Sequence, residues 1–158
     1  MIVAAPPPVY PWPIGVGPRY HPSAQEHDGR PIGTLRCTKS GATFAVHVEL
    51  FAKRRVVIGP PGIGGGPKCS YPLQTTAPTG VVHVARRGLT LGDLFRVWGR
   101  RLSRSRLLSF PGKVSVFVAG RRWHGEPRAV PLTKHSQIVV ETGGHVAPHP
   151  SYRFPKGD

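Results

Sequence analysis

Alternation of hydrophobic and polar residues predicts several β-strands in the middle of the chain. Residues 43–51 read T-F-A-V-H-V-E-L-F, so every second side chain from Phe44 onwards is large and apolar. This period of two is typical of a strand that buries one face. Shorter stretches of the same kind occupy residues 55–58, 80–85, 114–118, 121–123 and 136–141. We therefore expect a set of short strands, several of them joined as hairpins.

One segment has the period of an amphipathic helix instead. Between Thr90 and Leu102, apolar residues recur at positions i, i+3, i+4, i+7 and i+11 counted from Leu91. Thr90 has the side chain of an N-cap, and Asp93 follows three residues later, which is the spacing of a capping box. Two glycines inside the segment weaken it by up to about 1 kcal/mol each relative to alanine. The helix therefore depends on packing its apolar stripe against the sheet.

The order of these elements indicates an α+β fold that is mainly β. Three strands precede the helix and three follow it, and the chain of 158 residues has the length of one domain. We expect one small domain over residues 37–142, with a single helix packed on a mostly antiparallel sheet. A β-grasp-like roll and a small open barrel both satisfy this order.

Proline changes the expectation at the two ends of the chain. The first 36 residues contain eight prolines, which donate no backbone hydrogen bonds, so we expect an extended or flexible arm over residues 1–36. Residues 143–158 are expected to form an irregular tail laid over the surface. The N-terminus has no basic segment followed by a long apolar one, so we predict no signal peptide. No apolar run approaches the roughly 18 residues of a membrane span, and we expect no transmembrane segment.

Charge adds a candidate binding surface. The chain has 22 Lys and Arg against 7 Asp and Glu, a formal net charge of +15. Such a field attracts phosphates or anionic lipid headgroups, and arginine binds phosphate through two parallel hydrogen bonds. The alternative is that the arginines reflect a GC-rich genome and have no binding role. The candidate anion-binding residues are Arg86, Arg87, Arg96, Arg100, Arg101, Arg104 and Arg106, with further basic residues at Lys53, Arg54, Arg55, Arg121 and Arg122.

The cysteines and histidines permit two competing sites. A disulfide between Cys37 and Cys69 would close a loop of about 30 residues, contribute roughly 3–4 kcal/mol in the chain-entropy model, and imply an oxidising compartment. The alternative is a transition-metal site in which Cys69 joins His47 and His83, which lie on predicted strands. A disulfide removes the thiolate that a soft metal needs. We therefore expect the disulfide and no bound cofactor.

Catalytic chemistry has little support in the sequence. Glu49, Glu126 and Glu141 are the carboxylates left outside the predicted arm, tail and helix cap, and no motif relates them to a nucleophile. The glycine-rich run at residues 62–66 lacks the Gly-Lys-Ser/Thr ending of a phosphate loop. We expect no catalytic residues, and a non-catalytic binding or structural module. The alternatives are a protein that binds nucleic acid or an anionic membrane, and a transition-metal-binding protein.

Four segments, in this order and spacing, carry a resemblance. They are residues 47–51 (HVELF), 69–84 (from CSYPL to PTGVVHV), 89–99 (LTLGDLFRVWG) and 131–141 (from PL to HSQIVVE). Together they resemble an uncharacterised family of small bacterial proteins, best represented in actinobacteria, over roughly residues 36–155. Members of that family often look exported or membrane-anchored, which implies an extracytoplasmic or envelope-associated location.

The same resemblance bears on the metal site. Some wider relatives look histidine-rich around the first strand and just after the cysteine segment, which suggests a metal site in those proteins. Here the second of these stretches reads Gln74-Thr75-Thr76. The resemblance therefore leaves only His47, Cys69 and His83 as candidate ligands, and it implies no established activity.

Overall fold

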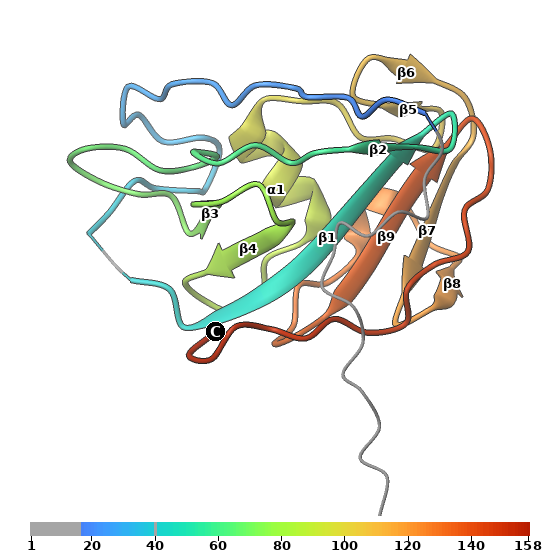
Figure 1. The fold of residues 1–158 in the computed structure, drawn as a ribbon. Coiled ribbons are helices and arrows are strands. Elements are labelled where there is room, and N and C mark those ends of the chain that lie inside the picture. The colour runs from blue at the N-terminus through green and yellow to red at the C-terminus, as the bar shows by residue number, and fades with distance from the viewer. Residues whose placement is uncertain (1–16, 40) are drawn as a thin grey trace, which may run out of the picture.

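The computed structural model describes residues 17–39 and 41–158. Figure 1 shows one curved sheet with a single α-helix lying across one of its faces. The elements in chain order are β1 (Phe44–Ala52), β2 (Arg55–Val57), β3 (Leu73–Gln74), β4 (Val81–Val84), α1 (Leu91–Trp98), β5 (Arg106–Leu107), β6 (Phe110–Pro111), β7 (Val114–Val118), β8 (Arg121–Trp123), the 3-10 helix η1 (Pro127–Ala129) and β9 (Gln137–Thr142).

The strand order identifies the architecture. The main sheet runs β3-β4-β1-β9-β7-β8, with β2 also paired to β1, while β5 and β6 form a separate hairpin. The central strands β1 and β9 are parallel, and all other strand pairs are antiparallel. First and last strands that lie parallel at the centre, with a helix crossing one face, make a β-grasp-like roll. The sheet does not close, and the parallel central pair with the helix across it favours the roll over the open barrel among the two predicted architectures.

The inner face of the sheet and one side of α1 form the main core. Val46, Leu50 and Ile138 of the sheet belong to the same buried cluster as Phe95 and Trp98 of the helix. A fully buried side chain of this kind contributes about 1.5–3 kcal/mol. The alternation read from the sequence therefore identifies the residues that hold the helix to the sheet.

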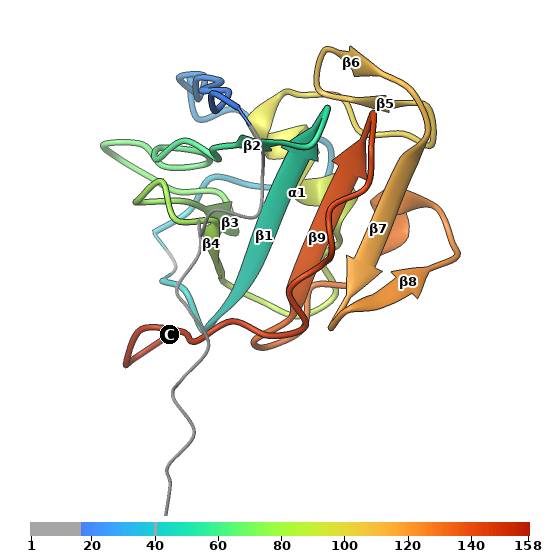
Figure 2. The same ribbon diagram turned by 45° about the vertical axis from the view of Figure 1, so that its right-hand side comes forward.

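The outer face of the sheet is buried as well, although the sequence predicts strands with one buried face. Every residue of β1 after Phe44 is buried, and so is every residue of β9. The C-terminal segment, residues 143–158, runs over this face without forming a helix or strand (Figure 2). Val146 of that segment packs with Phe51 and Val139 in a second, smaller cluster. Alternation along one strand cannot reveal a cover that comes from another part of the chain.

The helix begins where the sequence predicts and ends earlier. The Thr90 side chain accepts a hydrogen bond from the Asp93 backbone, and the Asp93 carboxylate accepts one from the Thr90 backbone at 2.9 Å. The helix was expected to reach Leu102 but ends at Trp98. The reason is Gly99, which adopts a left-handed conformation (φ 73°) that a residue without Cβ reaches at little cost.

The described part of the predicted N-terminal arm lies against the domain. Tyr20 makes backbone hydrogen bonds of 2.9 Å to Val56 and Ile58, and the Trp98 indole donates to the Ser23 carbonyl at 3.0 Å. Leu35 is buried in the main core. Residues 17–36 are therefore extended and packed, and the boundary expected at residue 36 does not mark the edge of the core. Residues 1–16 of the predicted arm lie outside the described residues.

Candidate functional site

A cavity of about 520 Å³ opens at the C-terminal end of α1. Half of its lining residues are arginines and none of them is acidic. We call it the arginine cavity, and it is lined by Phe95, Arg96, Gly99, Arg100, Arg101, Leu102, Ser103, Ser105, Arg106 and Arg128.

Local structure explains why the arginines gather there. Gly99 ends the helix and turns the chain into a loop, and the buried side chains of Leu102 and Leu107 anchor that loop to the core. Backbone hydrogen bonds of 2.9 Å close the loop, from Leu108 to the Arg101 carbonyl and from Ser103 to the Arg106 carbonyl. Ser103, Ser105 and Arg106 are therefore held on a hydrogen-bonded loop that lines the cavity.

The guanidinium groups of the cavity lack compensating charge. None of its five arginines forms an ion pair with a carboxylate of the described residues. Arg100 donates to the Ser23 carbonyl at 3.2 Å, but its Nε is buried and has no hydrogen-bond partner among the described residues. Arg128 donates to the Gly92 carbonyl at 3.0 Å. Arg106 donates to the Ser109 carbonyl at 3.3 Å. Since each guanidinium carries five N–H donors, these few bonds leave other donors of the five arginines without a protein acceptor among the described residues.

A second basic hollow adjoins the arginine cavity. Its volume is about 280 Å³, and its lining includes Arg104, Lys113, Arg122 and His124. The loop at residues 103–105 and the helix η1 contribute residues to both hollows. Arg104 forms an exposed ion pair of 2.7 Å with Glu126, which is the acidic residue of this region. Both hollows are therefore lined in part by the same loop and the same 3-10 helix, and both linings contain basic residues.

The structure brings together only part of the predicted arginine set. Arg96, Arg100, Arg101 and Arg106 line the arginine cavity, and Arg104 lies in the adjoining hollow. Arg86 and Arg87 are exposed on the loop between β4 and α1 and line neither.

Arg128 is the member of the cavity that sequence analysis missed. It lies on η1, outside the dense arginine stretch, so charge density along the chain gave no signal for it. Gly92 permits its approach, because a Cβ on Gly92 would stand 2.8 Å from the Arg128 Cβ. The helical glycine that lowers helix propensity thus lets η1 pack closely against α1.

A different polar cluster lies on the outer face of the sheet. His47 and Glu49 of β1 and Gln137 of β9 are all buried, with exposed fractions of 0%, 1% and 3%. The His47 Nδ1 lies 2.7 Å from the Gln137 amide oxygen, and the Gln137 amide nitrogen donates to Glu49 at 2.7 Å. The other ring nitrogen of His47 lies 2.9 Å from the Thr79 carbonyl. Together with His149, described next, these residues form what we call the outer-face network.

The C-terminal segment completes this network. The His149 Nδ1 lies 2.9 and 3.0 Å from the two Glu49 carboxylate oxygens, and the Tyr152 ring stacks on His47 with centroids 3.5 Å apart. Burial lowers the pKa of His47 from 6.5 to about 4. Burial also raises the pKa of Glu49, although its contacts with His149 and Gln137 oppose the shift. His47, Glu49 and Gln137 are therefore closed from solvent, and the partly exposed His149 ties the tail to the sheet.

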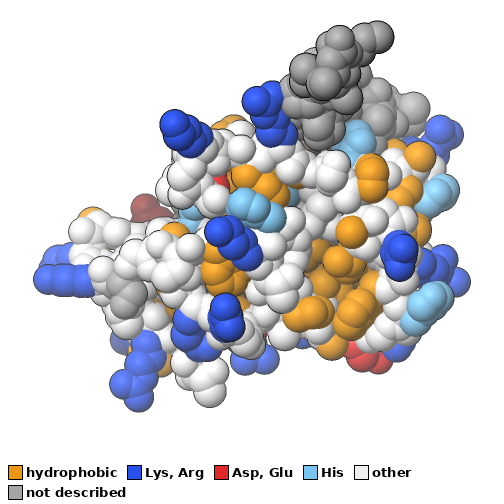
Figure 3. Space-filling view, turned by 90° about the horizontal axis from the view of Figure 1, so that it is seen from below, with side chains coloured by type: hydrophobic (Ala, Val, Ile, Leu, Met, Phe, Trp, Pro, Cys, Tyr) orange, Lys and Arg blue, Asp and Glu red, His pale blue; other side chains and the backbone are white. Residues whose placement is uncertain are grey.

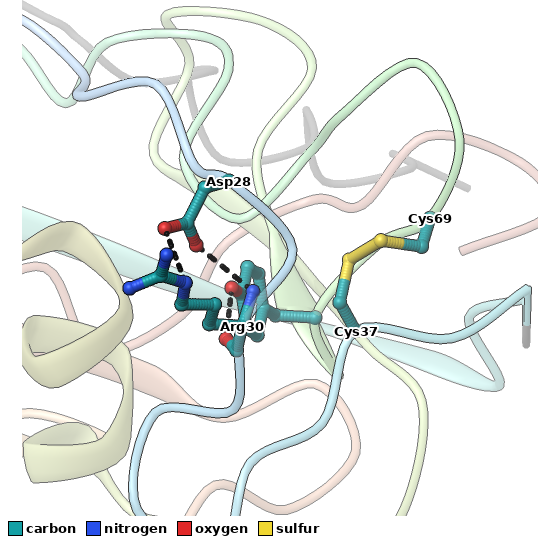
Figure 4. Close-up of a disulfide and its surroundings, with 5 residues drawn as sticks. Asp28, Arg30, Cys37 and Cys69 are labelled. Atoms are coloured by element: carbon teal, nitrogen blue, oxygen red, sulfur yellow. Dashed lines mark hydrogen bonds and ion pairs between the residues drawn. A yellow bond between two sulfur atoms is a disulfide. The ribbon is translucent and has the colours of Figure 1, made fainter.

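The predicted disulfide is confirmed. Cys37 and Cys69 are bonded with their Cα atoms 5.3 Å apart, and they join the N-terminal segment to the end of the glycine-rich loop (Figure 4). Cys69 is therefore not a free thiolate in this structure.

The predicted metal ligands are not brought together. His83 pairs with Ala45 in the antiparallel register, so it lies on the same sheet face as His47. Its Nδ1 lies 3.6 Å from an Asp158 carboxylate oxygen, whereas His47 faces Gln137 and Thr79. Within residues 17–39 and 41–158, no group of three or more His, Cys, Asp or Glu is arranged to hold a metal ion.

Two further findings bear on function. None of the helices in the described residues has the length and apolar character needed to cross a bilayer. No family model, no curated protein and no solved structure matches this chain.

Proposed function

We propose that this protein is a non-catalytic binding module whose arginine cavity holds phosphate groups of an extended polyanion. The observation that carries the proposal is the convergence of five arginines around one concave surface with no acidic residue in its lining. Arg96, Arg100 and Arg101 come from the helix and the loop after it, Arg106 begins β5, and Arg128 comes from η1. If the arginines were numerous only because of genome composition, we would not expect five of them to line one cavity.

Arginine geometry and the second hollow favour a polymer carrying several phosphates. A guanidinium forms two parallel hydrogen bonds to a phosphate, which makes arginine the preferred side chain for this anion. The arginine cavity lies within the roughly 300–1,000 Å³ range of ligand sites, so it accommodates one or a few such groups. The adjoining hollow with Arg104, Lys113 and Arg122 offers the next contact along the chain of a polymer.

The placement of the carboxylates supports a non-catalytic role. Asp93 caps the helix, Glu126 pairs with Arg104, and Glu49 lies inside the closed outer-face network. Glu141 accepts a hydrogen bond from the Val146 backbone at 2.9 Å. These groups serve the fold, and none of them lines the arginine cavity.

We also infer that the protein works outside the cytoplasm, because stable disulfides form in oxidising compartments. Mass spectrometry of the protein isolated from its host without reductant should give a mass two hydrogens below that of the fully reduced chain. Two thiols that react freely with an alkylating agent in that preparation would contradict this location.

The binding proposal is tested with a labelled single-stranded oligonucleotide and with long-chain polyphosphate at low salt. The double variant Arg96→Gln/Arg101→Gln should weaken binding by about tenfold, since each exposed charge contact is worth up to about 1 kcal/mol. The matched control Arg36→Gln/Arg86→Gln removes the same charge from exposed positions outside the cavity and should change affinity by less than about twofold. The affinity of the Arg96→Gln/Arg101→Gln variant should also depend less steeply on salt concentration.

Three results would overturn the proposal. Equal weakening by the two double variants would show that only the total charge matters. Absence of binding at low salt would show that the arginines have no such role. A strong preference for vesicles with anionic lipids over both soluble polymers would point to a membrane surface instead.

A further inference from the structure

A second sizeable cavity, of about 580 Å³, lies at the opposite end of α1. Its walls come from the start of β1, the loop between β4 and α1, and the segment that precedes β9. Phe44, Leu89, Pro131 and Leu132 give it an apolar interior, and Arg87 and Lys134 are the charged residues of its lining. We call it the lower cavity, because the start of β1 and the segment before β9 lie at the lower end of the fold as drawn in Figure 1.

The walls of the lower cavity are fixed by backbone hydrogen bonds. Leu132 donates to the Leu89 carbonyl at 2.9 Å, and Leu91 donates to the Val130 carbonyl at 2.9 Å. Thr43 at the start of β1 donates to the Val84 carbonyl at 2.8 Å. The three segments are therefore tied to one another before any ligand arrives, and a ligand would not have to pay for ordering them.

The chemistry of the lower cavity is that of an apolar site with cations at its entrance. Leu89 and Leu132 are buried, whereas Arg87 and Lys134 are exposed and have no ion-pair partner among the described residues. None of its lining residues is acidic. Figure 3 looks at this end of the molecule from below, where hydrophobic side chains gather beside Lys and Arg side chains.

We propose that the lower cavity binds an amphipathic anion: an aliphatic chain that carries one carboxylate, of the fatty-acid type. The chain would lie against Phe44, Leu89 and Leu132, and the carboxylate would meet Arg87 and Lys134 at the entrance. Burying apolar surface contributes roughly 25 cal/mol per Å², and the two cations add a preference for negative charge. This site is separate from the arginine cavity, whose lining is dominated by cations.

Titration calorimetry with three compounds that each carry a ten-carbon chain tests the charge preference. Decanoate should bind the full chain at one molecule per protein, decanol should bind at least about fivefold more weakly, and decyltrimethylammonium should bind most weakly. Lys134→Glu keeps the cavity open and reverses one entrance charge, so it should weaken decanoate binding by about tenfold. The arginine-cavity variant Arg96→Gln/Arg101→Gln should bind decanoate as the unmodified protein does.

A large side chain placed in the lower cavity tests whether decanoate binds there. Thr133 is an exposed lining residue, and Thr133→Trp should abolish decanoate binding while leaving the thermal unfolding midpoint nearly unchanged. The proposal is overturned if decanoate does not bind at millimolar concentration, or if Thr133→Trp and Lys134→Glu both leave its affinity unchanged. It is also overturned if decanol binds as tightly as decanoate, because the entrance cations would then have no role.

Discussion

The arginine cavity and the outer-face network are both rich in ionisable side chains, and they differ in how those charges are satisfied. In the network a carboxylate at 1% exposure contacts a histidine and a glutamine, and every contact comes from the protein itself. In the cavity the cations face one another across an open space with no acid in the lining. One region has its charges paired within the protein, and the other does not.

Because of this difference, we expect the two clusters to contribute to different properties of the protein. A buried carboxylate is tolerated only with good partners, so the network makes folding depend on the tail being in place. The cavity arginines are exposed or half-buried, so they cost less to maintain than a buried carboxylate, and an anion would relieve their mutual repulsion. Stability should therefore respond to changes in the network, and ligand binding should respond to changes in the cavity.

The largest expected effect comes from breaking the network at its centre. Glu49→Ala should lower the free energy of unfolding by about 3–5 kcal/mol, because it opens a cavity and leaves the buried Gln137 amide and the partly exposed His149 ring without the carboxylate they contact. Denaturant unfolding at neutral pH measures the loss. The control Glu126→Ala removes an exposed ion pair and should cost less than about 1 kcal/mol. Equal losses in the two variants would remove the distinction between the regions.

The second largest effect is expected in the pH dependence of stability, to which the buried groups of the outer-face network contribute. The folded pKa of His47 is about 4, below its ordinary 6.5, so the unfolded chain takes up this proton first as the pH falls. The His47 contribution to stability is therefore complete above pH 6.5 and is lost as the pH falls toward about 4, by about 3 kcal/mol in all. The raised pKa of Glu49 acts in the opposite sense, since its ionisation costs stability as the pH rises above its ordinary 4.5.

Comparison with a variant isolates the contribution of His47 to the pH dependence of stability. Unfolding free energies of the unmodified protein and of His47→Gln are measured between pH 7 and pH 4. The unmodified protein should lose more stability over this range than the variant does. Parallel pH profiles would mean that His47 keeps an ordinary pKa in the folded protein.

A smaller effect is expected where the tail stacks on the network. Tyr152→Ala removes the ring that lies 3.5 Å from His47 and should lower the free energy of unfolding by about 1–2 kcal/mol. The tail should also open more often, so trypsin should cleave after Arg153 faster than in the unmodified protein. Unchanged cleavage would show that other contacts hold the tail.

The smallest effect on stability is expected in the arginine cavity. Arg101→Gln and Arg106→Gln should each change the free energy of unfolding by less than about 0.5 kcal/mol. The stabilisation that added phosphate or polyphosphate gives the folded protein should nevertheless decrease in both variants. Thermal unfolding with and without the anion measures the two quantities together. A large loss of stability without ligand would mean that these arginines serve the fold.

The sequence by itself determined the local features. Period-two alternation located β1, β4, β7 and β9 to within a residue or two, and Thr90 with Asp93 located the start of the helix. These features depend on residues close together in the chain, where side-chain periodicity and capping act directly. The strands of two residues, β3, β5 and β6, contain too few residues to carry a pattern.

Tertiary structure decided what depends on distant residues meeting. The parallel pairing of β1 with β9 places Gln137 beside His47, 90 positions earlier in the chain. The tail then brings His149 onto Glu49, and η1 brings Arg128 into the arginine cavity. No local propensity encodes these contacts, because they arise only when burial of the two sheet faces fixes the packing of separate segments. The sequence alone thus determined which residues carry charge, and the packing decided which of those charges are paired and which remain open to a ligand.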